Sequence, residues 1–236
     1  MKYFFANFKL YIADQKQYEL LINEYQELSK KTDKELIIFP PLSLSAIPFT
    51  QNLKKGAQDF DCTSGNAQTG NISLSLLRSS GVTYVLIGHS KVRARGEALD
   101  ARIKKLEESY IQNIIPVFCI GEGIESANKS DAWNAIKDEL QEVREVALLN
   151  PEKELFIAYE PIWAIGSKEM KNPTAEHVLF LKEEIQKLFE GISIKILYGG
   201  SVNTASLSMI HESGVDGVLV GRSSLDITEV TKIIEA

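Results

Sequence analysis

The sequence predicts an α/β protein, a single-domain (β/α)8 barrel that spans residues 1–236. Short apolar runs recur along the chain, and each is followed by a segment whose apolar residues have helical spacing. The runs are almost continuously apolar, as expected for parallel strands that are buried on both faces. No linker or low-complexity segment separates them, so we expect one domain.

The predicted strands follow one another at intervals that leave room for a helix. They span residues 3–8, 35–39, 55–59, 84–87, 114–119, 155–159, 194–198 and 217–220. The clearest helical stretches between them span residues 14–30, 97–110, 132–148 and 173–189. Strands that alternate with helices in this way form a parallel sheet. Eight such units in 236 residues have the size of a closed barrel.

An open, doubly wound sheet is the alternative arrangement of these elements. That fold normally carries a glycine-rich turn after its first strand. This chain has Asn7, Phe8 and Lys9 at that point. The closed barrel is therefore favoured.

The composition limits the classes of partner and compartment. The chain carries 26 basic and 32 acidic residues, a net charge of −6, which argues against nucleic acid or an anionic membrane surface as the main partner. No segment approaches the roughly 18 apolar residues of a membrane span, and Lys9 interrupts the N-terminal apolar run too early for a signal peptide. Two cysteines, Cys62 and Cys119, are too few for a disulfide framework. We expect a reducing, cytoplasmic setting.

Polar residues collect after the predicted strands. In a (β/α)8 barrel the carboxyl ends of all strands surround one mouth, and that mouth holds the active site. Residues that are far apart in the sequence therefore meet there. They are Asn7 and Lys9, then His89, Glu160, the run from Tyr198 to Ser201, Gly221 and Arg222.

Glu160 directly follows the apolar run at residues 155–159. A carboxylate at the end of a buried strand loses part of its hydration, which makes it a stronger base. Pro161 restricts the backbone and Gly166 makes it flexible, as expected for the two ends of a mobile loop, or lid. Taken alone, Glu160 is equally compatible with a salt-bridged residue at the surface.

Three further residues complete a possible set of catalytic groups. His89 stands where a short helix could begin, and a helix N-terminus disfavours an imidazolium, so we expect a neutral imidazole that donates a hydrogen bond. Lys9 supplies a positive charge and Asn7 an amide. With Glu160 they suit proton abstraction next to a carbonyl group, through an enediolate. A turn histidine and a solvated lysine are the structural alternatives.

Glycine-containing turns follow the last two predicted strands. The run from Tyr198 to Ser201 and the turn at Gly221 present backbone amides, and barrels often bind phosphate at these two strands. Ordinary tight turns are the alternative. We assign His177 and His211 to helix surface or packing. No cluster has the spacing of a metal site, so we expect no metal and no cofactor.

Seven motifs, in this order along nearly the whole chain, resemble those of the triosephosphate isomerase family. They are ANFK (6–9), GAQD (56–59), IGHS (87–90), CIGE (119–122), AYEPIWAIG (158–166), YGGSV (198–202) and DGVLVGRSSL (216–225). The resemblance implies a TIM barrel. It also implies an enzyme of glycolysis and gluconeogenesis that interconverts dihydroxyacetone phosphate and glyceraldehyde 3-phosphate without a cofactor.

The resemblance also implies a role for each site residue. Glu160 is the base, His89 is the electrophile, and Asn7 and Lys9 bind and polarise the small phosphorylated triose. The phosphate is held, largely through backbone amides, by Gly166, Ser201, Gly221 and Arg222. Two other functions stay open: a phosphate-binding barrel enzyme that acts on a different sugar phosphate, and a non-catalytic barrel that serves as a binding or scaffold protein.

The resemblance implies a homodimer as well. In the family, a loop after the third strand reaches the site of the partner subunit. That loop would run from Asp61 to Asn71, and Thr69 matches the threonine that the family places at the partner's site.

Four positions depart from the family pattern. Lys91 replaces a carboxylate expected beside the catalytic lysine, and we expect it to turn to solvent. Asn71 and Val92 replace the two halves of an ion pair across the dimer, and such a paired loss can be nearly neutral. Residues 168–171, at the far hinge of the lid, read KEMK. Arg222 replaces a frequent second glycine.

Overall fold

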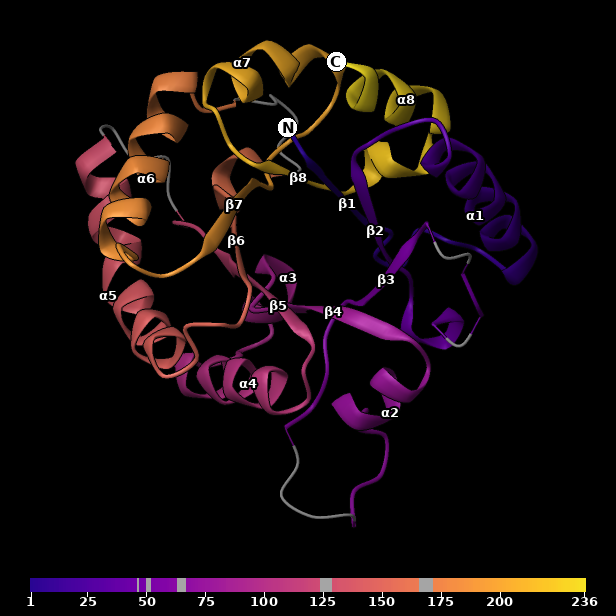
Figure 1. The fold of residues 1–236 in the computed structure, drawn as a ribbon, viewed down its shortest axis with the longest axis horizontal. Coiled ribbons are helices and arrows are strands. Elements are labelled where there is room, and N and C mark those ends of the chain that lie inside the picture. The colour runs from indigo at the N-terminus through magenta and orange to yellow at the C-terminus, as the bar shows by residue number, and fades with distance from the viewer. Residues whose placement is uncertain (46, 50–51, 63–66, 124–128, 166–171) are drawn as a thin grey trace.

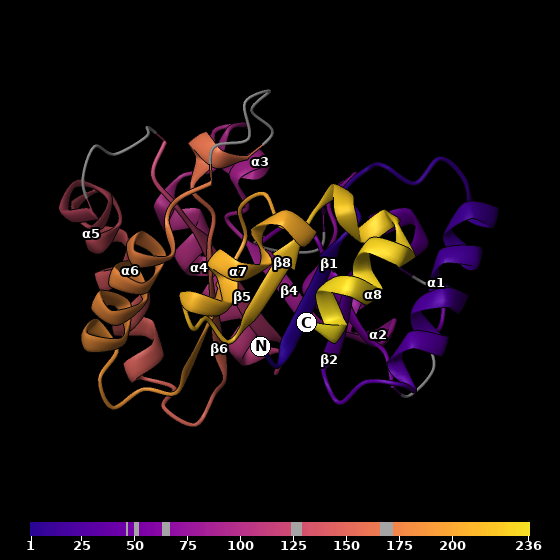
Figure 2. The same cartoon turned by 90° about the horizontal axis from the view of Figure 1, so that it is seen from above.

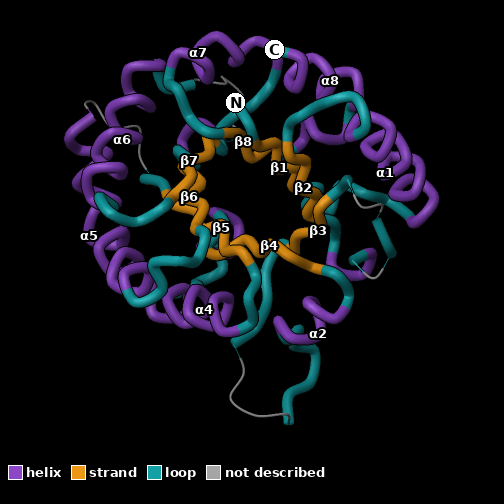
Figure 3. The backbone as a smooth tube through the Cα atoms, in the orientation of Figure 1, coloured by secondary structure: helices purple, strands orange, loops and turns teal. Residues whose placement is uncertain are grey.

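The computed structural model describes residues 1–45, 47–49, 52–62, 67–123, 129–165 and 172–236. Its eight strands form a closed parallel barrel in chain order, with the last strand paired to the first. The helices surround the strands (Figure 1), and the tube view shows the closed ring (Figure 3). The predicted barrel is confirmed. The strands are β1 Tyr3–Asn7, β2 Glu35–Phe39, β3 Lys54–Ala57, β4 Val82–Ile87, β5 Ile115–Ile120, β6 Leu155–Tyr159, β7 Ile194–Tyr198 and β8 Gly217–Val220.

Side chains from alternate positions fill the inside of the barrel. Along β1, Tyr3 and Phe5 belong to the interior cluster, whereas Phe4 and Ala6 pack outward against the helices. This alternation follows from the period of two along a strand. Aromatic rings pack edge to face inside; Tyr3 and Phe156, for example, have centroids 4.9 Å apart at 86°. The interior is therefore a packed core, and the polar site lies beyond it.

Apart from α3, which lies at one end of the barrel (Figure 2), the described α-helices form the outer layer. Asp14, for example, caps the first helix, because its Oδ1 accepts a hydrogen bond from the Gln17 N–H at 2.8 Å. None of the described helices is long and apolar enough to cross a membrane. The helices are α1 Gln15–Ser29, α2 Leu74–Ser79, α3 Ser90–Arg93, α4 Leu99–Ile111, α5 Lys129–Leu148, α6 Ala175–Leu188, α7 Leu207–Glu212 and α8 Ile227–Glu235.

The connection from β2 to β3 departs from the expected regular alternation. Its described residues contain a short 3-10 helix, η1 (Leu42–Leu44), in place of an α-helix. Pro40, Pro41 and Pro48 explain this, because proline has no N–H to donate within a helix. The buried Lys55 helps to hold the segment, since its Nζ donates to the Ser45 carbonyl oxygen at 2.6 Å.

The third strand also differs from its predicted range. It ends at Ala57 rather than at residue 59, because the next two side chains bind other segments. Gln58 Nε2 donates to the carbonyl oxygens of Lys9 and Phe39, at 2.9 and 3.1 Å. Asp59 accepts a hydrogen bond from Lys105 at 2.6 Å. These contacts fix the loop beside the mouth. In the side view, α3 lies at the same end of the barrel (Figure 2).

Candidate active site

A cavity of about 470 Å³ lies at the carboxyl ends of the strands. The structure brings together there all the predicted site residues except Gly166, which lies outside the described residues. The end of β1 contributes the amide of Asn7, and the connection after it contributes the cation of Lys9. The turn between β4 and α3 contributes His89, which caps α3, and the loops after β6, β7 and β8 contribute the rest. The lining includes Asn7, Lys9, Tyr11, His89, Glu160, Ile165, Ser201, Asn203, Gly221, Arg222 and Ser223.

Glu160 is buried, with 2% of its surface exposed. Its backbone N–H donates to the Ile120 carbonyl oxygen at 2.7 Å, which extends the pairing of β6 with β5 by one residue. Its Oε2 accepts a hydrogen bond from the Ser90 N–H at 3.1 Å, and its Oε1 lies 3.2 Å from His89 Nε2. The surface salt bridge considered from the sequence is therefore wrong.

Two glycines leave the space that Glu160 occupies. A Cβ on Gly199, after β7, would lie 2.8 Å from Glu160 Cγ. A Cβ on Gly121, after β5, would lie 1.8 Å from the Glu160 carbonyl oxygen. Both distances are shorter than any stable carbon contact. A glycine therefore follows each of the two strands beside β6, and the absence of a side chain there leaves room for the backbone and the side chain of Glu160.

His89 faces Glu160 with its protonated nitrogen. Its Nδ1 accepts a hydrogen bond from the Lys91 N–H at 3.1 Å, so in a neutral ring the proton is on Nε2. Burial lowers the pKa of His89 and favours the neutral form, against the opposing attraction of Glu160. The positive charges of Lys9, Arg93 and Lys91 lower the pKa further. The sequence indicated a neutral histidine because of a helix terminus, whereas burial is the larger cause.

Lys9 has an unusual backbone conformation, with φ at 47°. This left-handed region is unfavourable for a residue with a side chain, so other contacts must maintain it. The Lys9 N–H donates to Asn7 Oδ1 at 3.1 Å, and the Lys9 carbonyl oxygen accepts the bond from Gln58. The strained backbone directs the amine toward the β8 turn, where a Cβ on Gly221 would lie 3.5 Å from Lys9 Nζ.

The turns after β7 and β8 line the same cavity as Glu160 and His89. Ser201 Oγ donates to the Ala164 carbonyl oxygen at 2.6 Å and so links the β7 turn to η2 (Ile162–Ala164) after β6. Gly221 precedes η4 (Arg222–Leu225). The Arg222 guanidinium carbon lies 5.5 Å from the centroid of the Tyr11 ring, which follows β1.

Comparison with known proteins gives the family. The sequence model of triosephosphate isomerase matches residues 2–236. The chain belongs to the triosephosphate isomerase family. The triosephosphate isomerase of Alkaliphilus metalliredigens is 35% identical over 215 residues, which cover 86% of this chain and 87% of that protein. The one from Dictyoglomus thermophilum is 32% identical over 243 residues, which cover 98% and 97%. Membership in this family makes the protein an isomerase.

Lys91 and Val92, two of the departures from the triosephosphate isomerase pattern, lie close to Lys9. Lys91 is exposed, as expected, and lines a second cavity of about 670 Å³ with Lys9, Val92 and Arg95. Residues 168–171 of the hinge lie outside the described residues. In the described parts of the chain, no carboxylate forms an ion pair with Lys9. The amine is therefore available to an anion.

One buried network was missed in the sequence. Glu122 accepts hydrogen bonds from the Tyr159 hydroxyl at 2.9 Å and from Trp163 Nε1 at 2.7 Å. The Tyr159 hydroxyl also lies 3.2 Å from His177 Nε2. His177 therefore packs inside, as one of the two expectations had it, while His211 is exposed. The signal for the network was the carboxylate of the CIGE motif, since an acid that follows a buried strand needs partners.

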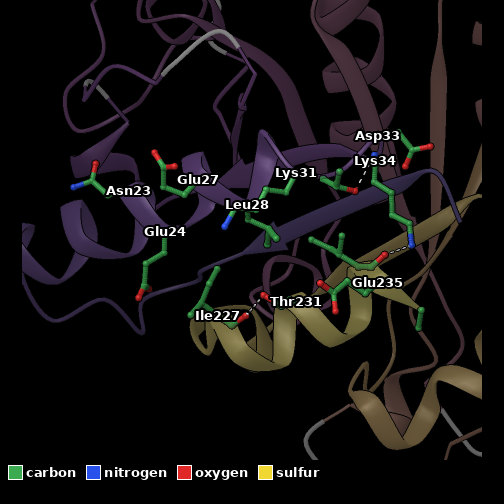
Figure 4. A pocket seen from close by; sticks show the side chains of 13 residues that line it. Asn23, Glu24, Glu27, Leu28, Lys31, Asp33, Lys34, Ile227, Thr231 and Glu235 are labelled. Carbon is green, nitrogen blue, oxygen red and sulfur yellow. Dashed lines mark hydrogen bonds between the residues drawn. The ribbon is translucent and has the colours of Figure 1, made fainter.

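A groove of about 890 Å³ lies elsewhere, between α1 and α8 (Figure 4). It is larger than the mouth cavity, but its lining is open and of mixed charge, with Glu27, Lys31 and Glu235 among the labelled residues. Lys34 Nζ donates to the Ile234 carbonyl oxygen there. Among the described residues, no three His, Cys, Asp or Glu side chains come together as a metal site would require, here or at the mouth.

Proposed function

We propose that this isomerase interconverts dihydroxyacetone phosphate and glyceraldehyde 3-phosphate by proton transfer through an enediolate. One observation carries the proposal: Glu160 and His89 are buried side by side at the mouth, with Oε1 and Nε2 3.2 Å apart. A carboxylate base and a neutral donor must both reach the same substrate, one at carbon and the other at oxygen. A scaffold protein would have no use for such a pair.

In this mechanism Glu160 moves one proton between two carbon atoms. Its carboxylate takes the proton from the carbon next to the carbonyl group, and the electron pair of that bond forms the enediolate. His89 Nε2 donates a hydrogen bond to the oxygen that gains negative charge. The hydroxyl proton on the first carbon's oxygen moves to the former carbonyl oxygen, and Glu160 returns its proton to the neighbouring carbon, so the substrate and the product have the same atoms. The N–H of Lys91 supports this role, because it keeps the His89 proton on Nε2.

The other site residues bind the substrate. Lys9 supplies a cation for the developing oxyanion, and Asn7 holds the Lys9 backbone through the 3.1 Å hydrogen bond. Ser201, Gly221 and Arg222 surround the phosphate, together with Gly166 outside the described residues. Backbone amides at turns of this kind bind phosphate well. Phosphate affinity and proton transfer thus come from different residues of one cavity.

A coupled assay with purified protein tests the proposal. We expect turnover of glyceraldehyde 3-phosphate with a chelator present, and loss of at least about 100-fold in kcat for His89→Gln. A panel of other phosphorylated aldoses serves as the comparison. Faster turnover of a different sugar phosphate would assign the site to that substrate, and no turnover of any would contradict an isomerase acting through Glu160.

We further propose that the protein is a homodimer. Leu10 is 86% exposed beside the second cavity, which Leu42 and Val92 also line. The described parts of the predicted contact loop, residues 61–62 and 67–71, extend away from the barrel (Figure 1). An apolar surface of this kind next to a projecting loop suits a second copy of the chain. Sedimentation equilibrium should give twice the mass of 26.3 kDa, and a monomer at micromolar concentration would contradict the dimer.

A further inference from the structure

The guanidinium of Arg222 is held at the mouth without an anionic partner. Its carbon lies 5.5 Å from the centroid of the Tyr11 ring, and both residues line the 470 Å³ cavity. Within the described parts of the chain, Arg222 forms no ion pair and no hydrogen bond. An exposed arginine normally extends into water. Here an aromatic face from the β1 connection keeps it at the edge of the site.

The nearby acids are already bound to other groups. Asp226 Oδ1 caps α8 through the N–H groups of Thr228 and Glu229, at 2.9 and 3.3 Å. Glu229 Oε1 accepts a hydrogen bond from the Thr204 N–H at 2.6 Å. Within the described parts of the chain, neither carboxylate forms an ion pair with Arg222. The positive charge therefore remains available to an anion that enters the cavity.

A second cation lies close to the same turn. Lys9 Nζ would be 3.5 Å from a Cβ on Gly221, the residue that precedes Arg222. β1 and β8 are hydrogen-bonded neighbours, which is why their connections meet here (Figure 1). Two cations beside one turn attract a doubly charged anion more strongly than a singly charged one.

We propose that Tyr11 is a positioning residue that holds the Arg222 guanidinium at the phosphate end of the cavity, so that the site selects dianionic phosphate monoesters. The proposal rests on the function proposed above. The ring restricts a side chain that otherwise has many rotamers, which reduces the entropy lost when arginine binds a phosphate. A guanidinium can then bind two phosphate oxygens at once.

Four variants test the role of the ring. Arg222→Gln should raise the KM for substrate about tenfold with kcat nearly unchanged. Tyr11→Leu should raise the KM about threefold, whereas Tyr11→Phe, which keeps the ring, should stay within about twofold of the wild type. Arg78→Gln is the matched control, because the exposed Arg78 on α2 carries the same charge and does not line the cavity.

Binding of inorganic anions tests the role of Tyr11 independently of the proposed isomerase reaction. Sulfate and perchlorate are tetrahedral and differ in charge, and calorimetry measures their binding without turnover. The wild type should favour sulfate, and both Arg222→Gln and Tyr11→Leu should reduce the preference. Failure of the isomerase assay would count against the proposed reaction only, because anion binding does not depend on it.

A double-mutant cycle decides between positioning and a general structural role. If the ring acts through Arg222, Tyr11→Leu should reduce sulfate affinity in the wild type but not in the Arg222→Gln variant. If Tyr11→Leu weakens sulfate equally in both backgrounds, or if Tyr11→Phe behaves like Tyr11→Leu, the ring does not act through Arg222 and the proposal is overturned.

Discussion

The two sides of the mouth cavity are built differently. On the side of β4 and β6, His89 and Glu160 are 5% and 2% exposed, and hydrogen bonds from backbone N–H groups fix both side chains. On the side of β1 and β8, Tyr11 is 41% exposed and Arg222 is held by a ring contact. The first side is rigid and partly dehydrated, and the second is open and positively charged.

This difference indicates a division of work. Proton transfer needs atoms placed within tenths of an ångström, which burial and backbone hydrogen bonds provide. Electrostatic attraction of a charged substrate acts over longer distances. It therefore works even when the attracting cations are exposed and partly screened by salt. Changes on the β4–β6 side should therefore reduce kcat, and changes on the β1–β8 side should reduce affinity.

The largest effect is expected for Glu160→Asp. The shorter side chain moves the carboxylate away from the substrate carbon by about one methylene, and we expect kcat to fall at least about 100-fold with little change in KM. Steady-state kinetics measures both. Glu190→Asp, at an exposed position in the turn after α6, is the control. Wild-type turnover by Glu160→Asp would remove Glu160 from the role of base.

Removal of the phosphate tests the other side of the cavity. A phosphorylated enediolate mimic should bind with a chelator present, and its analogue without the phosphate should bind about 100-fold more weakly, because charge-assisted hydrogen bonds are lost. Isothermal titration gives both affinities. Equal affinities would mean that the turns after β7 and β8 are not a phosphate site.

A moderate effect is expected for Gly199→Ala. The new Cβ would lie 2.8 Å from Glu160 Cγ, so the carboxylate must shift. We expect kcat to fall about tenfold and the free energy of unfolding to fall by about 1–3 kcal/mol. Gly123→Ala adds the same atom where nothing lies within 4 Å, and it should change neither quantity. Full activity in Gly199→Ala would show that the position of Glu160 is less restricted.

The smallest effect is expected for Lys91→Glu. Lys91 is exposed, so kcat at neutral pH should change by less than about twofold. Its charge nevertheless lowers the pKa of His89, and a glutamate should raise it. The neutral imidazole would then be lost at a higher pH than in the wild type. NMR titration of the imidazole nitrogens, assigned with His89→Gln, measures this shift, and a collapse of turnover would give Lys91 a role of its own.

The sequence predicted the barrel because buried parallel strands are apolar throughout, and β2, β6, β7 and β8 have their predicted bounds. Strand ends were harder to predict. Gln58 and Asp59 look like a continuation of β3, and only their contacts with Lys9 and Lys105 show that they belong to a loop.

The mouth residues were predictable because the carboxyl ends of barrel strands converge. Their mutual geometry was not. The contact of Tyr11 with Arg222 and the hydrogen bonds of Glu122 with Tyr159 and Trp163 join residues more than 35 positions apart. No periodicity in the sequence encodes such pairs, because they depend on how two loops pack after the strands have closed.

The two glycines that flank Glu160 have a genetic consequence. Every missense change of a glycine codon introduces a residue with a Cβ. At positions 121 and 199 that atom would overlap the backbone or the side chain of Glu160. A saturation mutagenesis screen should therefore score these two positions among the least tolerant in the chain. Glycine is required at both positions because Glu160 fills the space that any side chain would occupy.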